Sequence, residues 1–426
     1  MYKQYVSTKE ALEIILDQVP EPQIESVPLE EAYDRILAEK VTATYPIPPF
    51  DRSPYDGYAV RFEDIITASE STPVTLKVVE EIPAGHVPKK AIFAGEAARI
   101  MTGAPIPENA DTIIKFEDTH LRKDENQHYV DDLQQIQILR RPKAAGNFSK
   151  VGEDMDTGDC MLEVGRIIDP AAIAVLATFG YRCINVYSRP TAIVLASGDE
   201  LVSADQPISP GKIRNSNAPS LTAQLRSWGV DAVEGGIARD DHQKLANMIL
   251  HALQTYKIVI TTGGVSAGDY DVMKEVLQSI GAEILFWRVA MRPGTPLVVA
   301  KWGDSIIFGL SGNPSAAYIS CELFVRAYVL KIQKHEDYWR VPVQARLIDD
   351  LKTVSQDRFL RAVAYVDPLG HVVVKPLPKQ KSGILANLLD TNALIYIPAG
   401  DFNTKTGGMV EVILLKPPKG LDGYGA

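Results

Sequence analysis

The sequence predicts a multidomain α/β protein in which a mostly parallel sheet is flanked by β-rich segments. From about residue 190 to 335, β-branched runs alternate with helical stretches, which is typical of βαβ units. Residues 56–140 and the chain beyond about 340 instead show short alternating strands separated by turns. The 426 residues are also sufficient for about two to four domains.

The first part of the chain is expected to begin with a helix and to hold an inserted β-rich domain. Ser7 and Glu10 have the spacing of a capping box, and apolar residues follow at helical spacing. Pro170 and Gly180 bracket a predicted helix over 171–179. Strands are predicted in the inserted domain at 75–79, 98–101, 112–116 and 134–139.

Strands and helices alternate regularly in the second half, and a short β pattern follows them. Strands are predicted at 191–196, 231–237, 258–262, 284–289, 297–300 and 305–310, and helices at 218–228, 242–256, 272–280 and 314–332. The last strands are predicted at 341–347, 362–366, 371–374, 393–397 and 410–415.

These patterns divide the chain into four predicted domains. Residues 1–45 with 146–185 form an N-terminal helical and mixed domain, and 46–145 form the inserted β-rich domain. Residues 186–335 form the α/β domain, and 336–426 a small C-terminal β domain.

Composition excludes several classes of function. The net charge of −10 argues against a nucleic-acid-binding surface. The three cysteines lie far apart without a CxxC motif, which argues against a disulfide framework and fits a cytoplasmic protein. The N-terminal segment carries acids within its apolar pattern, so neither a signal peptide nor a membrane partner is expected.

Four loops rich in Gly, Asp and Asn each follow a predicted strand of the α/β domain. They span residues 197–200, 239–241, 262–271 and 311–314. Parallel strands bring such loops to one edge of the sheet, where ligands bind in α/β folds. The alternative is that these residues serve only as turns and helix caps, which any single loop would allow.

Acids and glycines at these loops favour a phosphate site with a divalent cation. The carboxylates of Glu200, Asp240 and Asp271 are oxygen ligands of the kind that Mg²⁺ prefers. Gly263 and Gly264 allow the backbone to approach an anion closely.

Other residues favour oxyanion binding. A helix is expected to begin near Asn313 and Ser315, where unpaired N–H groups attract anions. Arg288 and Arg292 lie in the run RVAMRPGTP, and the planar fork of an arginine suits an oxyanion. The alternative for each arginine is a solvated charge or a structural ion pair. Ser311 opens the last of the four loops.

Residues 264–268 also match G-x-S-x-G, the nucleophile elbow of hydrolases, with Ser266 as the candidate nucleophile. His335 and His371 lie downstream, as that mechanism would require. The extra glycine before the pattern and the acids after it fit an anion-binding loop better, so serine hydrolysis is the weaker interpretation.

Nine motifs occur in a fixed order along the chain. They read FDRSPYDGYAV, RIMTGAPIP, VGED, SGDEL, IRNSN, IARDD, TTGGVSAGDYD, VAMRPGTP and SGNPSAA. Together they resemble the molybdopterin molybdenumtransferase family, which includes MoeA proteins and the C-terminal domain of gephyrin. The resemblance covers nearly the whole chain and implies a Mog-like α/β sheet domain.

The resemblance further implies a homodimer whose partner subunit completes the active site. The implied reaction inserts molybdate into adenylated molybdopterin with Mg²⁺ present and releases AMP. An adenylyltransferase that supplies the substrate is an implied partner. Two alternatives remain open, namely a molybdopterin adenylyltransferase and a non-catalytic, gephyrin-like scaffold.

Residue chemistry and the resemblance together predict the site. The resemblance alone implies catalytic roles for Asp56, Thr102 and Asp154, and catalytic roles are also predicted for Asp240 and Asp271. Substrate or oxyanion binding is predicted for Gly263, Gly264, Ser266, Arg288, Arg292, Ser311, Asn313 and Ser315, and the resemblance adds Arg361 from the C-terminal side. Ser382 is a weaker candidate from that side. Metal ligation is predicted for Glu200, Asp240 and Asp271.

Three positions depart from the family pattern. Arg288 stands where many relatives carry lysine, which keeps the charge, and Ser311 stands at the first proline of the usual Pro-Gly-Asn-Pro. Thr295 stands at the lysine of the family's Pro-Gly-Lys-Pro element, so one expected cation is missing. We expect its hydroxyl to donate a weaker hydrogen bond to the oxyanion.

Overall fold

The computed structural model of the chain describes residues 3–120, 122–123, 129–130, 134–239, 241–264, 270–351, 356–400 and 404–420, with the backbone alone at 122–123, 129–130 and 270–272. The chain forms two compact units. Unit 1 comprises residues 1–38, 164–173 and 182–426, and unit 2 comprises 39–163 and 174–181. No helix in these described ranges is long and apolar enough to cross a membrane.

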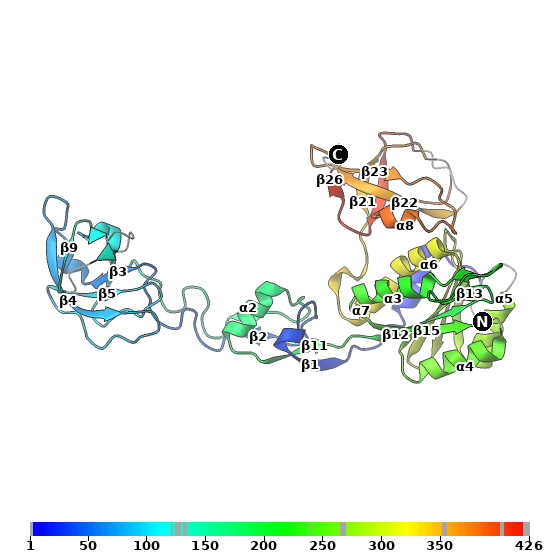
Figure 1. Cartoon of the computed structure of the whole chain (residues 1–426), viewed down its shortest axis with the longest axis horizontal. Helices are drawn as coiled ribbons and strands as arrows, with labels where there is room; N and C mark the ends of the chain where they lie inside the picture. Colours follow the sequence, from blue (N-terminus) through cyan, green and yellow to red (C-terminus); the bar gives the residue numbers. More distant parts are fainter. Residues whose placement is uncertain are drawn as a thin grey trace. The chain divides into compact units, whose positions relative to one another are not determined.

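A five-stranded sheet in the order β6-β3-β5-β4-β9 builds the core of unit 2 (Figure 1). Its strands are β3 (Gly57–Val60), β4 (Val74–Ile82), β5 (Glu96–Ile100), β6 (Thr112–Lys115) and β9 (Gln135–Ile138). Two separate clusters of buried apolar side chains contact this sheet, one including Tyr58 and the other including Ala59. Neighbouring residues of β3 thus pack on opposite faces, as pleating requires.

No strand is predicted at β3, because Asp-Gly is a dipeptide typical of tight turns. In the structure, β3 lies between β5 and β6 and is buried along its length. A Cβ atom at Gly57 would lie 1.9 Å from the carbonyl oxygen of Ile114, so this glycine permits close packing of two strands.

Small elements complete the first half of the chain. Helix α1 (Thr8–Leu16) begins after Ser7, whose Oγ accepts the backbone N–H of Glu10, as the capping box predicts. The other elements are β1 (Ile24–Pro28), η1 (Leu29–Glu31), β2 (Val41–Thr42), η2 (Phe62–Ile65), η3 (Phe116–Asp118), β7 (Arg122–Lys123), β8 (Tyr129–Val130), β10 (Cys160–Leu162), α2 (Pro170–Thr178) and β11 (Cys183–Tyr187).

A six-stranded sheet in the order β15-β12-β16-β20-β19-β17 forms the α/β part of unit 1. Four strands are parallel, namely β12 (Thr191–Ser197), β15 (Asp231–Ala238), β16 (Ile258–Thr262) and β20 (Ser305–Leu310). The strands β17 (Glu283–Arg288) and β19 (Pro296–Trp302) extend it antiparallel. This mostly parallel sheet confirms the predicted fold class.

Helices cover both faces of the sheet. Buried residues of α3 (Asn217–Ser227) and of the helical segment 314–332 share one apolar cluster with the sheet. Buried residues of α4 (His242–Leu253) and α5 (Tyr270–Ser279) share a second cluster with it. The short strands β13 (Leu201–Val202) and β14 (Ile213–Arg214) pair beside them.

The predicted helix over 314–332 is not uniform. It consists of α6 (Pro314–Ser320), a π-helical segment η4 (Cys321–Val325) and α7 (Arg326–Ile332). The wider π turn places buried Glu322 near Gln224 and Arg340.

The C-terminal part closes into a small barrel-like β domain. Strands β22, β23, β21, β25 and β24 pair in that order, and β24 pairs again with β22. Their bounds are β21 (Val343–Leu347), β22 (Asp357–Val366), β23 (Val372–Pro376), β24 (Ala393–Ile397) and β25 (Met409–Leu414). The elements η5 (Glu336–Tyr338), α8 (Asn387–Asp390) and β26 (Lys419–Gly420) lie around it.

The α/β part also contributes a strand to the C-terminal sheet. Strand β18 (Met291–Arg292) pairs in parallel with the start of β22, so that Arg292 is the register partner of Arg358. The division into four domains stays a prediction, since the structure separates only the two units.

Candidate functional site

The carboxyl ends of four parallel strands meet at one edge of the sheet. The register aligns Ser197 with Ala238, and Thr262 with both Ala196 and Leu310. The four predicted loops therefore follow strands that end side by side. The expectation that the strands before these loops end at one edge is confirmed.

Close backbone packing shapes the centre of this edge. Gly263 has φ +91°, and an added Cβ atom would lie 2.1 Å from the carbonyl oxygen of Ser197. The N–H of Gly263 donates to the carbonyl of Leu310 at 3.2 Å. Gly263 therefore holds neighbouring loops together, and Gly264 continues the turn with φ +67°.

Two predicted residues of this edge, Asp240 and Ser266, lie outside the described residues. Asp271 lies in α5, where the structure describes its backbone alone. Glu200 is described and is exposed. Among the described residues, no three His, Cys, Asp or Glu side chains form a metal-binding group. Metal ligation by the three acids stays a prediction.

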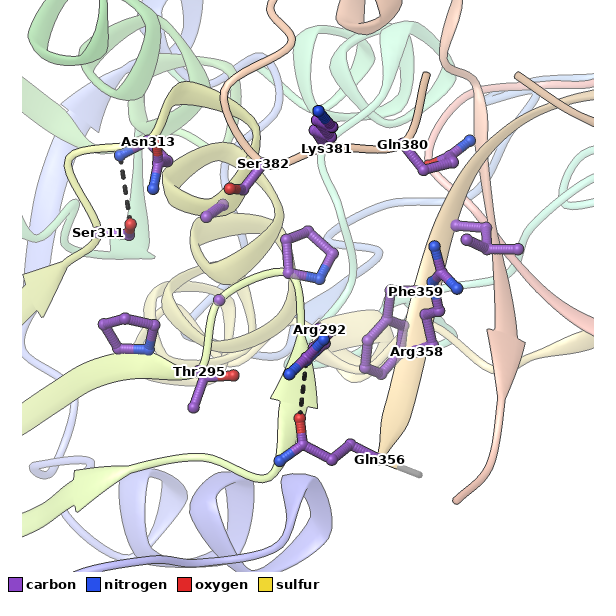
Figure 2. Close-up of a pocket in the computed structure, with 15 residues that line it drawn as sticks. Arg292, Thr295, Ser311, Asn313, Gln356, Arg358, Phe359, Gln380, Lys381 and Ser382 are labelled. Carbon is purple, nitrogen blue, oxygen red and sulfur yellow. Dashed lines mark hydrogen bonds between the residues drawn. The ribbon is translucent and has the colours of Figure 1, made fainter. Parts of the chain in front are cut away.

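A basic pocket of about 800 Å³ lies where the α/β part meets the C-terminal barrel (Figure 2). Its cationic lining residues are Arg292 from β18, Arg358 from β22 and Lys381 from the loop before α8. No aspartate or glutamate is among the residues that line it in the described part of the chain. Three cations without a local counter-charge favour an anionic ligand.

Neutral residues complete the pocket. Ser311, Asn313, Gln356, Gln380 and Ser382 all line it. The Ser311 hydroxyl accepts the backbone N–H of Asn313 at 3.2 Å, which orders the turn before α6. Figure 2 shows this bond and the hydrogen bond from Arg292 to Gln356.

Arg361 and Ser315 lie behind the pocket and do not line it. Arg361 is 1% exposed, and its Nη1 donates to the Ser315 hydroxyl and to the carbonyl of Ile384. Its Nη2 donates to the carbonyls of Lys379 and Lys381 at 3.2 and 3.1 Å. Burial lowers the pKa of Arg361.

These contacts fix the loop that carries Lys381 and Ser382. Ser315 reinforces it, because its backbone N–H donates to the carbonyl of Ser382 at 3.1 Å. Oxyanion binding by Arg361 and Ser315 stays a prediction, and what the structure shows is that both support the pocket wall.

Oxyanion binding by Thr295 and Arg288 also stays a prediction. The hydroxyl of Thr295 donates to the carbonyl of Met291 at 2.5 Å, so its one proton is not directed at a ligand in this structure. Arg288 ends β17 beside the N-terminal segment, where its carbonyl accepts the N–H of Val6 at 3.0 Å. Arg288 does not line the basic pocket.

Asp56 and Thr102, two of the three predicted residues of unit 2, are in direct contact. One carboxylate oxygen of Asp56 accepts both the backbone N–H and the hydroxyl of Thr102, each at 2.7 Å. Both residues line a pocket of about 810 Å³ that also includes Arg99 and Lys115. Asp154 is exposed and is not among the lining residues.

Sequence reasoning missed Arg358, Lys381 and Gln356. Arg358 stands in the same RFLRA run as Arg361, so a signal was present. Its partnership with Arg292 depends on pairing between β18 and β22, which are far apart in sequence.

A mostly parallel sheet covered by helices on both faces, with glycine-rich loops after its strands, defines the class of open α/β folds. A family model described as "Probable molybdopterin binding domain" matches residues 193–331. The models "MoeA N-terminal region (domain I and II)" and "MoeA C-terminal region (domain IV)" match residues 6–180 and 344–415.

Known proteins are similar over nearly the whole chain. Proteins named "Molybdopterin molybdenumtransferase" are 38% identical in Staphylococcus epidermidis, over 96% of this chain and 95% of that protein, and in Bacillus subtilis, over 93% and 91%. A crystal structure of a molybdopterin biosynthesis MoeA protein from Pyrococcus horikosii has a TM-score of 0.81 at 30% identity. It covers 97% of this chain and 100% of that one. The chain belongs to the molybdopterin molybdenumtransferase (MoeA) family of enzymes.

Proposed function

We propose that this enzyme inserts molybdate into adenylated molybdopterin and releases AMP, and that the basic pocket holds the oxyanion. The observation that carries this proposal is the convergence of Arg292, Arg358 and Lys381 without an acidic lining residue. The name and full-length similarity of the relatives support a molybdopterin-type substrate. They do not support the adenylyltransferase or the non-catalytic scaffold.

Charge and position supply most of the proposed catalysis. Two anionic reactants repel each other, and cations fixed in a pocket reduce the cost of bringing them together. The guanidinium groups of Arg292 and Arg358 provide planar forks for oxyanion oxygens. Gly263 and Gly264, both at positive φ, are suited to bring the backbone close to a phosphate group.

The acids at the sheet edge are suited to Mg²⁺. Glu200, Asp240 and Asp271 follow β12, β15 and β16, which are neighbours in the sheet, and all three supply hard oxygen ligands. When bound, Mg²⁺ would neutralise charge on the phosphoanhydride. The residues of the chain then have the task of holding the adenylate and the oxyanion in fixed positions.

Molybdate-dependent release of AMP from adenylated molybdopterin tests the proposal. We expect Arg358→Ala to raise the KM for molybdate by about 10- to 100-fold, the range for losing a hydrogen bond to a charged group. Arg346→Ala is the matched control, since this arginine lies exposed on β21 of the same domain and outside the pocket. Repeating the assay with tungstate measures metal preference.

Three outcomes would count against the proposal. Adenylate formation from molybdopterin and ATP would favour an adenylyltransferase. Absence of turnover with intact peptide binding would favour a scaffold. An unchanged KM in Arg358→Ala and Lys381→Ala would show that the pocket does not bind molybdate during the reaction.

We also propose that the enzyme is a homodimer, which predicts a solution mass of twice 46.7 kDa by light scattering.

A further inference from the structure

We propose that Gln356 and Tyr5 are positioning residues that set the orientation of Arg292 in the basic pocket. This inference rests on the proposed function, in which Arg292 holds the oxyanion. The Nε of Arg292 donates to Gln356 Oε1 at 3.0 Å, as Figure 2 shows. Gln356 Nε2 in turn donates to the Tyr5 hydroxyl at 2.6 Å. The three side chains form a continuous chain of hydrogen bonds from the N-terminal segment to the pocket.

Gln356 leaves the useful part of the arginine available. It accepts from Nε, which leaves the two Nη groups to form a bidentate fork with an oxyanion. Arg292 is exposed, so its guanidinium would otherwise sample many rotamers. Among the described residues, Gln356 is the hydrogen-bond partner that the structure gives this side chain. The amide therefore fixes the rotation of the fork without neutralising its charge.

The backbone beneath this chain of hydrogen bonds is held in register. Met291 and Arg292 pair with Asp357 and Arg358, which places Gln356 directly before the paired residues. This parallel pairing keeps the amide of Gln356 within reach of the arginine Nε. The positions of Arg292 and Gln356 are thus set by a shared strand contact as well as by their side chains.

The N-terminal segment is anchored to the same junction. The N–H of Ala290 donates to the carbonyl of Val6 at 2.8 Å, one residue before β18. The hydroxyl of Thr8 donates to Asp357 Oδ2 at 2.9 Å. Tyr5 is therefore carried by a segment bonded both to the β18 side and to the β22 side of the junction. This explains how a residue near the start of the chain can influence a distant pocket.

Steady-state kinetics of molybdate-dependent AMP release test the inference. We expect Gln356→Met, which keeps the side-chain length but removes the acceptor, to raise the KM for molybdate about tenfold. The value of kcat should change by less than about twofold, because the effect is on binding. Tyr5→Phe should raise KM about two- to threefold, since it acts one hydrogen bond further away. Gln344→Met is the matched control, because this exposed glutamine lies on β21 and away from the pocket.

A double-mutant cycle separates positioning from direct binding. If Gln356 acts through Arg292, then Gln356→Met should add nothing to the KM of Arg292→Ala. If Arg292→Ala shows no turnover, titration calorimetry with sodium tungstate measures the dissociation constant of each variant in the same cycle. Circular dichroism melts of every variant identify any that has lost its fold.

The outcomes distinguish the two proposals. An unchanged KM in Gln356→Met, or the same rise in the Arg292→Ala background, overturns the positioning role and leaves the pocket's function intact. Wild-type KM and wild-type tungstate affinity in Arg292→Ala would instead overturn the proposed function of the pocket at this residue.

Discussion

Replacing Arg361 should detach the loop that forms one wall of the basic pocket. The buried guanidinium donates to the Ser315 hydroxyl and to the carbonyls of Lys379, Lys381 and Ile384. Arg361→Met keeps much of the apolar stem and removes every donor. The Ile384 carbonyl still accepts from the Ser315 hydroxyl, whereas the carbonyls of Lys379 and Lys381 lose the arginine donor. Each acceptor left buried without a donor costs about 1–3 kcal/mol.

The expected loss is about 3–5 kcal/mol of the stability of the C-terminal barrel, because part of the loop can move into solvent and recover hydrogen bonds. Arg361→Lys should lose less, since an ammonium group retains the charge but cannot reach all of these acceptors at once. Arg346→Met, on the exposed face of β21, is the matched control and should change stability by less than about 0.5 kcal/mol.

Hydrogen exchange followed by mass spectrometry reports on the loop directly. We expect faster exchange of residues 379–384 in Arg361→Met than in the wild type, with exchange at β16 and β20 unchanged. Urea unfolding monitored through the hydrogen exchange of peptides from β22 and β24 measures the stability of the barrel alone. Wild-type protection of the loop together with wild-type stability of the barrel would refute the supporting role of Arg361.

Three further predictions concern other parts of unit 1 and the cysteines. Gly263→Ala should lower the melting temperature by several degrees, about 2 kcal/mol or more, because its Cβ would lie 2.1 Å from the Ser197 carbonyl oxygen; an unchanged calorimetric melt would contradict it. Burial raises the pKa of Glu322 above its ordinary 4.5. The contribution of this group to the free energy of unfolding is therefore fully present below pH 4.5 and is lost as the pH rises through the pKa of the folded state. Glu322→Gln should remove this decrease in the free energy of unfolding, which urea unfolding at a series of pH values from 4.5 upward measures. The same pH slope in Glu322→Gln and the wild type would contradict the role of Glu322. Iodoacetamide should label exposed Cys183 in the native protein but reach buried Cys321 only after unfolding, as peptide mass spectrometry can check, since burial raises the pKa of the Cys321 thiol well above its ordinary value.

The sheet that positions the glycine loop was predictable because its strands carry a strong local signal. Residues 258–262 are a continuous apolar and β-branched run, and in the structure they are buried on every side. This strand ends at the glycine turn that begins with Gly263, so the position of the glycine loop could be predicted from the sequence.

Two strands were harder to predict for a specific physical reason. Strand β22 begins at Asp357, five residues before the predicted 362–366. The predicted strand begins late because Arg358 and Arg361 interrupt the apolar pattern of β22. The burial of Arg361 depends on carbonyls from a loop about twenty residues later, which local propensity does not represent. Strand β3 was hidden by its initial glycine.

The site was predictable in its residue types but only partly in its partners. The run RPGTP predicts a role for Arg292, whereas Arg358 and Lys381 come from the C-terminal barrel of the same unit, whose folding brings them to the same pocket. The hydroxyl of Thr295 turns to a local carbonyl, a choice of hydrogen bond that sequence alone leaves open.

The clustering of Arg292, Arg358 and Lys381 has a further consequence for the junction that they share. Like charges gathered with no acidic residue among the described lining residues repel one another, so they weaken this junction in the free protein. Under the proposed function, an oxyanion bound among them would convert that repulsion into attraction and bridge strand β18 to the barrel. By mass action, such a ligand at free concentration c would stabilise the docking of the two parts by RT ln(1 + c/Kd), so the oxyanion would also act as a structural crosslink between them.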